Sequence, residues 1–228
     1  MIKIKKILKM VVSLPKTFSL NCRLFPLKTA IHLPIITTYD AVLHDVVRGS
    51  CIIEGNIRTG MIRLGWGGGS VGVPGITEKT QWSVRGKIIF KGSAMFARGS
   101  SVRVDPEGEL TLGEHFSCNK NCFLAAEKRI VIGNNATLGW NVNIRDSDGH
   151  SIYRMDDPEA HMLNEPEEVR IGDHVWICSY ADILKGVTIP NDCVVAYRSC
   201  CVKPFTKENT IIAGTPAKVV RERIMWKF

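Results

Sequence analysis

A six-residue repeat constrains this chain more than any other feature of its sequence. Between residues 171 and 201 an apolar side chain stands at every sixth position, and a second, mostly small side chain follows four residues later, as at Val175 and Ala181. The anchors of this run are Ile171, Ile177, Ile183, Ile189, Val195 and Cys201. A helix repeats every 3.6 residues and an ordinary strand every two, so neither produces this spacing. Short strands separated by corners do, and three of them per turn predict a parallel β-helix.

The same spacing occurs earlier in shorter runs, which polar or turn-forming stretches separate. Their anchors are Val84, Phe90, Phe96 and Val102, then Leu112, Cys118 and Leu124, and finally Ile132, Leu138 and Ile144. The composition suits short strands and tight corners, because 20 of the 228 residues are glycine and only 7% are aromatic. Most of the eight cysteines fall on repeat positions, so we expect buried free thiols rather than a disulfide framework.

Several segments on this repeat resemble the hexapeptide-repeat acyltransferases. They are "IGNNAT", "LGWNVN" and "IGDHVW", followed by "ILKGVTIPNDCVV" and "IIAGTPAKVV", and the resemblance covers roughly residues 84–224. It implies an all-β fold, a left-handed parallel β-helix of hexapeptide repeats, usually assembled as a homotrimer with active sites between subunits. We expect a basic leader over residues 1–56, the β-helix over 57–215, and a short C-terminal helix over 216–228 that caps the last coil.

The resemblance also implies an enzyme, an acetyl-CoA-dependent O-acetyltransferase whose acceptor is a hydroxyl of a cell-surface glycan or its precursor. Such a transfer needs a base beside the hydroxyl and a groove for the thioester, and it requires no metal. The family's catalytic histidine matches His150, which ends "NVNIRDSDGH" where the repeat stops, and residues 149–168 are expected to form an acceptor loop. Asp146 or Asp148 could orient the histidine or simply form the turn. Asn119 matches an amide that contacts the acceptor, although an asparagine at a coil corner is equally ordinary.

Other positions match the family's site for coenzyme A. Trp176 and Ser179 match residues beside the thioester, and packing at a corner is the alternative for the tryptophan. Lys203 and Arg221 match basic positions near the nucleotide phosphates. Tyr197, with Arg198 after it, stands along the pantetheine track where the family has small residues. Larger side chains there could narrow the groove or abolish binding, so a non-catalytic β-helix scaffold or binding module remains the alternative function.

The N-terminal 39 residues are strongly basic, with seven Lys or Arg and no acid before Asp40. This segment resembles the leader of polysaccharide and lipopolysaccharide O-acetyltransferases. It could contact an anionic membrane surface peripherally or remain a solvated arm. No apolar run is long enough to span a bilayer, and Lys9 interrupts the run that a signal peptide would need, so we expect a cytoplasmic protein.

Two other classes fit the sequence poorly. A γ-type carbonic anhydrase needs three histidines converging on zinc, and His115, His150, His161 and His174 lack the required spacing. The glycine-rich stretch 58–75 lacks the context of a nucleotide-binding loop, and no nucleic-acid motif is present.

Overall fold

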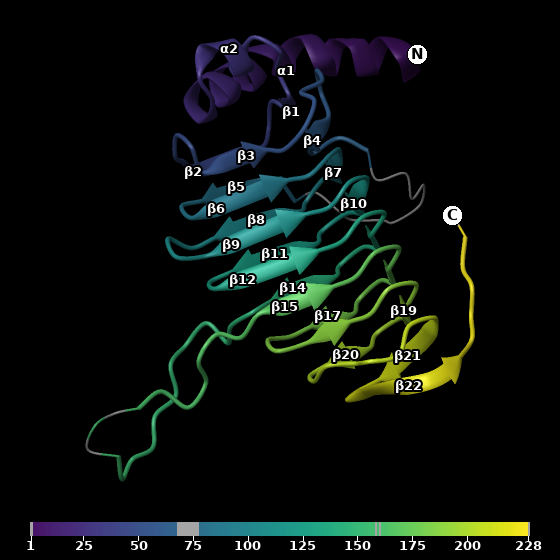
Figure 1. The fold of residues 1–228 in the computed structure, drawn as a ribbon. Coiled ribbons are helices and arrows are strands. Elements are labelled where there is room, and N and C mark those ends of the chain that lie inside the picture. The colour runs from purple at the N-terminus through teal and green to yellow at the C-terminus, as the bar shows by residue number, and fades with distance from the viewer. Residues whose placement is uncertain (1, 68–77, 158, 160, 228) are drawn as a thin grey trace.

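The computed structural model describes residues 2–67, 78–157, 159 and 161–227, and its strands wind into a parallel β-helix (Figure 1). Three sheets form the sides of the coil, here called A, B and C in the order in which the chain meets them. In the described residues, sheet A contains β1 (Ile35–Thr37), β4 (Ile62–Leu64), β7 (Ala94–Phe96), β10 (Phe116–Cys118), β13 (Thr137–Leu138), β16 (Trp176–Ile177), β19 (Val194–Val195), β21 (Thr210–Gly214) and β22 (Ala217–Glu222).

Sheets B and C complete each coil. Sheet B consists of β2 (Val42–Val46), β5 (Gln81–Val84), β8 (Ser101–Val104), β11 (Phe123–Ala126), β14 (Asn143–Arg145), β17 (Asp182–Ile183) and β20 (Cys200–Cys201). Sheet C consists of β3 (Cys51–Ile53), β6 (Lys87–Phe90), β9 (Glu109–Leu112), β12 (Arg129–Ile132), β15 (Val169–Ile171) and β18 (Thr188–Ile189). Among the strands that the structure describes, every pair except β21 with β22 is parallel, as expected when each strand stacks on its equivalent one coil away.

The strand register confirms the six-residue repeat. In sheet A, Cys118 pairs with Leu138, Leu138 with Ile177, and Ile177 with Val195. The anchors of sheets B and C stack in the same way, and all of them are buried in one continuous core. All eight cysteines are free, and five of them are buried. Burial raises the pKa of the Cys201 thiol to about 12, so this residue acts as an apolar filler of the coil interior.

The corners between sheets follow from a few backbone conformations. At the corners from sheet A to sheet B, here the A/B corners, Asn121, Asn141, Tyr180 and Arg198 have φ between 56° and 62°. Asparagine tolerates this left-handed region better than most residues, whereas Tyr180 and Arg198 occupy it at a steric cost. Gly139 serves close approach instead, because a Cβ there would lie 2.5 Å from the Ser179 nitrogen of the next coil.

Both predicted ends of the β-helix differ from the structure. The coils begin before residue 57, since β1, β2 and β3 already pair with β4, β5 and β6 of the three sheets. The glycine-rich stretch 58–75 contributes β4, and its residues from 68 onward lie outside the described residues.

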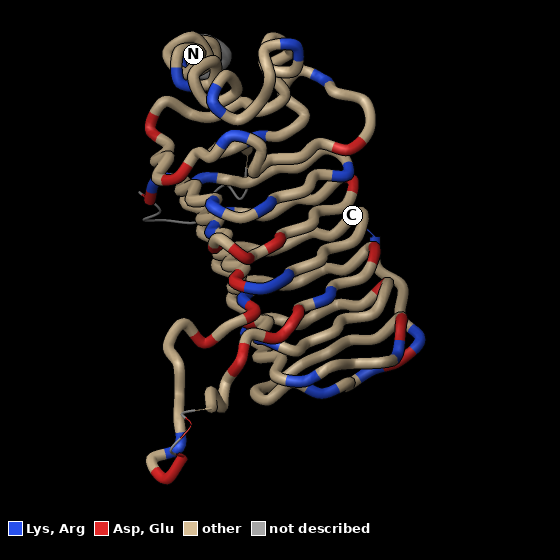
Figure 2. Tube along the Cα trace, turned by 60° about the vertical axis from the view of Figure 1, so that its left-hand side comes forward, with Lys and Arg blue, Asp and Glu red and all other residues tan. Residues whose placement is uncertain are grey.

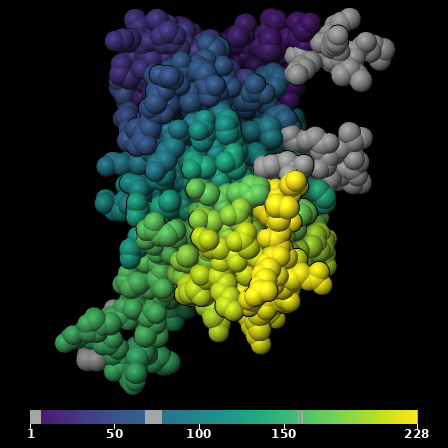
Figure 3. Space-filling model, turned by 45° about the vertical axis from the view of Figure 1, so that its right-hand side comes forward, coloured from purple at the N-terminus to yellow at the C-terminus, as the bar shows by residue number. Residues whose placement is uncertain are grey.

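The expected C-terminal helix is wrong, because Ala217–Glu222 forms strand β22, antiparallel to β21. An edge strand needs a hydrogen-bonding partner, and the β-branched Val219 and Val220 suit a strand better than a helix. Beyond β22 the chain turns back along the coils, visible as the yellow segment in Figure 3. Trp226 ends this segment with its ring stacked on His174 at a centroid distance of 4.1 Å.

Two helices cover the N-terminal end of the stack (Figure 1). They are α1 (Ile2–Leu24) and α2 (Leu27–Ala30). Among the described residues, no helix combines the length and the apolar character that crossing a bilayer requires.

Candidate functional site

A long loop leaves the coils between β14 and β15, in the corner from sheet B to sheet C, and projects from the stack (Figure 1). Its two arms lie antiparallel, with a bridge between Tyr153 and Met162. The Ile152 N–H donates to the Asn164 side chain at 2.7 Å, and the Leu163 N–H donates to the Ile152 carbonyl at 2.8 Å. In its described residues, the predicted acceptor loop 149–168 therefore has a hydrogen-bonded stem.

Asp146 anchors this loop where it leaves the coils. Its side chain is fully buried and accepts hydrogen bonds from the backbone N–H groups of Glu127, Lys128 and Arg129 at 2.8, 2.8 and 2.6 Å. Burial raises the pKa of Asp146, against the opposing effect of these three donors, which favour the carboxylate. The Asp146 carbonyl also accepts from the Glu167 N–H at 2.9 Å, so one residue ties down both ends of the loop.

His150 lies four residues beyond this anchor and is exposed. A small cavity of about 40 Å³ adjoins it, lined also by Glu127, Met162 and Asn164. The His150 carbonyl accepts a hydrogen bond from the Asn164 amide at 2.8 Å, which fixes the backbone at this position. Within the described residues the imidazole has no hydrogen-bonding or ionic partner, so both ring nitrogens are available to an incoming group.

Asp148 is paired with residues other than His150. Its carboxylate lies 2.8 Å from the Lys185 ammonium and accepts from the Asn164 amide at 3.0 Å. The hydrogen bonds from Lys185 and then Asn164 lower the pKa of Asp148, which keeps it ionised. Orientation of the histidine by Asp148 remains a prediction.

Lys203 lies at the same corner as His150, one coil beyond Lys185. The register that pairs Ile183 with Cys201 places Lys185 and Lys203 at equivalent positions, and both line a cavity of about 260 Å³ together with Asp148. The sequence reasoning missed Lys185 and Asn164. Lys185 could have been found from the repeat, because it follows its anchor by two residues, as Lys203 does.

Asn119, Ser179 and Tyr197 lie instead on the A/B corners. The Asn119 N–H donates to the Leu138 carbonyl at 3.0 Å. Ser179 is buried, and its hydroxyl accepts from the Trp140 N–H at 3.1 Å. Tyr197 packs edge-on against Tyr180 at 5.5 Å, and the Arg198 guanidinium lies 5.5 Å from the centre of each ring. These aromatic and cationic groups occupy the corner at which the resemblance predicts small residues.

The remaining predicted donor-site residues lie on sheet A. Trp176 is 40% exposed, and its ring centre is 5.9 Å from that of Trp226 on the C-terminal segment. Arg221 lies in β22 opposite Ile211. A single chain therefore divides the predicted residues: His150, Asp148 and Lys203 lie at the far end of sheet B from Asn119, Ser179 and Tyr197.

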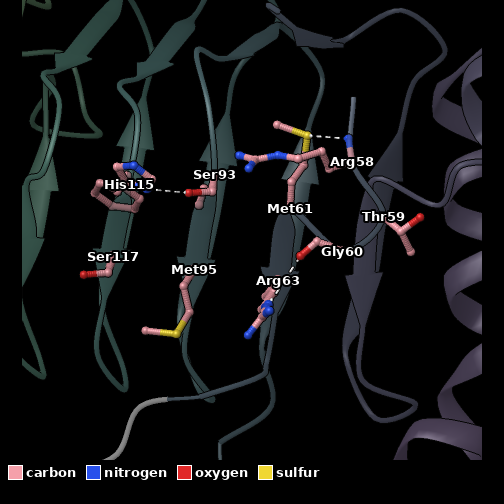
Figure 4. Close-up of a pocket in the computed structure, with 11 residues that line it drawn as sticks. Arg58, Thr59, Gly60, Met61, Arg63, Ser93, Met95, His115 and Ser117 are labelled. Carbon is pink, nitrogen blue, oxygen red and sulfur yellow. Dashed lines mark hydrogen bonds between the residues drawn. The ribbon is translucent and has the colours of Figure 1, made fainter. Parts of the chain in front are cut away.

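A separate cleft of about 470 Å³ lies on sheet A near the N-terminal end and contains none of the predicted residues (Figure 4). Ser93 and His115 share a hydrogen bond there, 3.0 Å between the hydroxyl oxygen and Nδ1, and Arg58 and Arg63 border the same space. Across the described parts of the chain, no three His, Cys, Asp or Glu side chains gather closely enough to hold a metal ion.

Comparison with known proteins relates the chain to sugar O-acetyltransferases. No protein-family model matches it. It is 29% identical over 127 residues to galactoside O-acetyltransferase of Escherichia coli (strain K12), covering 56% of this chain and 57% of that protein. It is 40% identical over 108 residues to polysialic acid O-acetyltransferase of Neisseria meningitidis, covering 47% and 49%. The chain thus spans only about half the length of the curated relatives it matches.

Among solved structures, acetyltransferases also align with parts of the chain. The polysialic acid O-acetyltransferase OatWY shares 26% identity at a TM-score of 0.44, covering 82% of this chain and 75% of that one. A galactoside acetyltransferase in complex with coenzyme A shares 24% identity at a TM-score of 0.42, covering 63% of each. These TM-scores reflect limited overall superposition, so the assignment rests on the repeat and the sequence relatives. On that basis the chain is similar to the hexapeptide-repeat O-acetyltransferases over about half of their length.

Proposed function

We propose that this protein transfers an acetyl group from acetyl-CoA to a hydroxyl of a sugar in a cell-surface glycan or its precursor, with His150 as the general base. The observation that carries the proposal is an imidazole without an internal partner, held on a loop whose exit from the coils Asp146 fixes. The relatives named as galactoside and polysialic acid O-acetyltransferases support a sugar acceptor.

His150 performs two proton transfers in this reaction. A ring nitrogen takes the proton from the acceptor hydroxyl as its oxygen bonds to the thioester carbonyl carbon. When the carbon–sulfur bond breaks, the imidazolium returns the proton to the departing thiolate, which leaves the acetyl ester and free coenzyme A. A histidine suits both steps because its usual pKa lies near neutrality. Neither step needs a metal ion.

The donor is held by groups from both sets of predicted residues. Ser179, Trp176 and Tyr197 would flank the acyl and pantetheine part, whereas Lys203 and Arg221 would neutralise phosphates, with Lys185 adding a further cation beside Lys203. Asn119 would contact the acceptor through its amide, which both donates and accepts hydrogen bonds. The free state of all eight cysteines supports the cytoplasm as the site of the reaction, and contact of the basic N-terminal segment with a membrane is part of the same proposal.

A homotrimer would bring these two sets together. Because His150 and Ser179 lie on different corners of one chain, the site is complete only if one subunit supplies the base and its neighbour supplies the A/B corner. Mixing tests this directly: His150→Ala chains and Tyr197→Glu/Arg198→Glu chains, each inactive alone, should regain roughly a quarter of the wild-type sites after random reassembly in equal amounts. Failure to regain activity in mixed trimers would place the site within one chain.

The function is tested by measuring release of the coenzyme A thiol with a panel of nucleotide sugars and glycan fragments. His150→Ala should lower the rate by about 10²–10⁴-fold, the usual contribution of a general base. His161→Ala is the matched control, since His161 belongs to the same loop but is paired with Asp157 at 3.0 Å, and it should leave the rate within about two-fold. No release with any acceptor, or equal rates in both variants, would refute the proposal.

A binding scaffold without catalysis is the second candidate, favoured by the Tyr180, Tyr197 and Arg198 cluster that fills the A/B corner. Calorimetric titration with acetyl-CoA separates the two functions. Saturable binding supports the transferase, and its absence supports the scaffold.

A further inference from the structure

Helix α1 is unusual because it turns a polar stripe towards the rest of the protein. Ser13, Thr17 and Asn21, spaced four apart and hence on one face, are all buried, with Leu20 and Leu24 beside the C-terminal half of the stripe. In most surface helices the buried stripe is apolar and the outer face is polar.

The polar stripe replaces a missing strand beside β1. Asn21 donates through its amide to the Ile35 carbonyl at 2.7 Å and accepts from the Ile35 N–H at 3.1 Å. Thr17 makes the corresponding pair of bonds with Thr37 at 3.2 and 3.1 Å, and the Ser13 hydroxyl accepts from the Tyr39 N–H at 3.0 Å. The first strand of the β-helix thus has its free edge satisfied by side chains of α1, which explains why these positions are polar.

Much of the remaining surface of α1, and of the segment around α2, is apolar and exposed. Seven large apolar side chains of α1, Leu27 of α2 and Ile31 directly after α2 are each between 50% and 68% exposed; those of α1 are Ile7, Leu8, Met10, Val11, Val12, Leu14 and Phe18. We call these residues the apolar cap. None of them is needed to cover β1, since the polar stripe already does so, and nine large apolar residues on one end are far more than a scatter of single exposed side chains.

Positive charge accompanies the apolar cap. Residues 1–39 contain seven Lys or Arg and no Asp or Glu, and Figure 2 shows only blue charged positions on the two helices. Two of the seven are engaged internally, since Lys16 donates to the Ala41 carbonyl at 2.7 Å and Lys9 lies 5.1 Å from the centre of the Trp66 ring. Arg23 and Lys28 are exposed beside the apolar cap.

We propose that the apolar cap, with its basic flanks, binds the surface of an anionic phospholipid bilayer and holds α1 parallel to the membrane plane. A helix with an apolar face, basic borders and insufficient length of apolar sequence to span is suited to this position. The positive charge favours a membrane over a second copy of this chain as the binding partner of the apolar cap. Two copies would bring like charges together, whereas an anionic surface places negative charge opposite the basic residues. Each basic residue near such a surface adds about five-fold to binding.

The orientation has a consequence for the acetyl transfer, and this step rests on the proposed function. The loop with His150 leaves sheet B at β14, four strands from β2 in the order β2-β5-β8-β11-β14. At a strand spacing of about 4.8 Å this places its coil roughly 19 Å from the first. A stack standing on its α1 end therefore presents the base to glycan units that extend away from the bilayer rather than to lipid headgroups.

Vesicle co-sedimentation of the full chain tests the proposal with phosphatidylcholine vesicles and with vesicles containing phosphatidylglycerol. The wild type should bind the anionic vesicles at least ten-fold more tightly, and Leu8→Glu/Val11→Glu should lose at least ten-fold of that binding. Val220→Glu, which changes a side chain that is 61% exposed on β22, is the matched control and should bind as the wild type does. Arg23→Gln/Lys28→Gln keeps the apolar cap and should weaken only the preference for anionic vesicles.

A tryptophan probe distinguishes insertion from mere attraction. In Phe18→Trp, the added tryptophan should contribute fluorescence that the wild type lacks. On anionic vesicles, brominated lipids should quench this fluorescence. Three results would each overturn the proposal: absence of quenching, equal sedimentation of Leu8→Glu/Val11→Glu and wild type, or a change in oligomer mass that depends on the apolar cap and occurs without vesicle binding. The third result would identify a second copy of the chain as the occupant of the apolar cap. Failure here is separable from failure of the transferase, since His150→Ala should still bind vesicles and Leu8→Glu/Val11→Glu should still acetylate free sugars.

Discussion

Removing the Asp146 carboxylate should both destabilise the protein and disturb the proposed base. Asp146→Ala deletes three hydrogen bonds of 2.8, 2.8 and 2.6 Å and leaves three backbone N–H groups without their partner in a buried setting. Each such bond to a charged group contributes about 1.5–3 kcal/mol. The cost of burying the carboxylate, seen in its raised pKa, offsets part of the sum. We therefore expect a net loss of about 3 kcal/mol.

A loss of about 3 kcal/mol corresponds to a fall in the unfolding temperature of roughly 6–12 °C for a chain of this length. Scanning calorimetry and urea unfolding measure it. Asp148→Ala is the matched control, because its carboxylate is 42% exposed and an exposed ion pair contributes at most about 1 kcal/mol. Acetyl transfer in Asp146→Ala should fall by about ten-fold while acetyl-CoA affinity is unchanged, since the loop loses its anchor but the A/B corner does not. Equal stabilities of the two variants would refute this role of Asp146.

Three further predictions concern other parts of the fold. Asn21→Ala should lower the free energy of unfolding in urea by about 2–4 kcal/mol, because the buried N–H and carbonyl of Ile35 lose their hydrogen-bonding partners. An unchanged urea midpoint would contradict the role of α1 side chains as hydrogen-bonding partners of β1. Tyr197→Ala should weaken acetyl-CoA binding in calorimetric titration, because the ring that would flank the pantetheine part is lost. Tighter binding would show that the large side chain narrows the A/B corner instead of contacting the donor. Burial acts to raise the pKa of Asp105, but hydrogen bonds from Arg103 and Arg85 outweigh it and lower that pKa. The stability that Asp105 adds relative to Asp105→Asn should therefore be present above about pH 4 and disappear as the pH falls through the lowered pKa. A stability difference that persists at about pH 2 would count against this.

The sequence predicts the β-helix well because the fold imposes a strict physical requirement on it. A narrow interior must be filled at fixed intervals, so the anchors Ile177 and Leu138 are apolar and buried, and the six-residue period survives in the sequence. The position of His150 follows for the same reason, since the repeat stops where the loop leaves the coils.

The ends of the stack could not be predicted in this way. The first and last strands are defined by which backbone edges would otherwise be unpaired, and this is a property of the assembled fold rather than of local sequence. Val219 and Val220 fit an apolar helix stripe or a strand equally well by spacing, and only the free edge of β21 decides between them. The role of Thr17 and Asn21 likewise depends on β1, whose backbone they hydrogen-bond.

The sequence also did not predict that the candidate site residues are divided between two corners of the β-helix. Matching of motifs assigns residues to a common site but does not show which side of the triangle each one occupies. The strand register supplies that information, since it places Lys203 beside Lys185 and leaves Ser179 at the other end of sheet B.

The claim that His150 is the base is tested most directly by chemical rescue. In His150→Ala, acetyl-CoA affinity measured by calorimetry should equal that of the wild type, acetyl transfer should be at least about 100-fold slower, and added imidazole should restore part of the rate in proportion to its concentration. Transfer at the wild-type rate without imidazole would contradict the account.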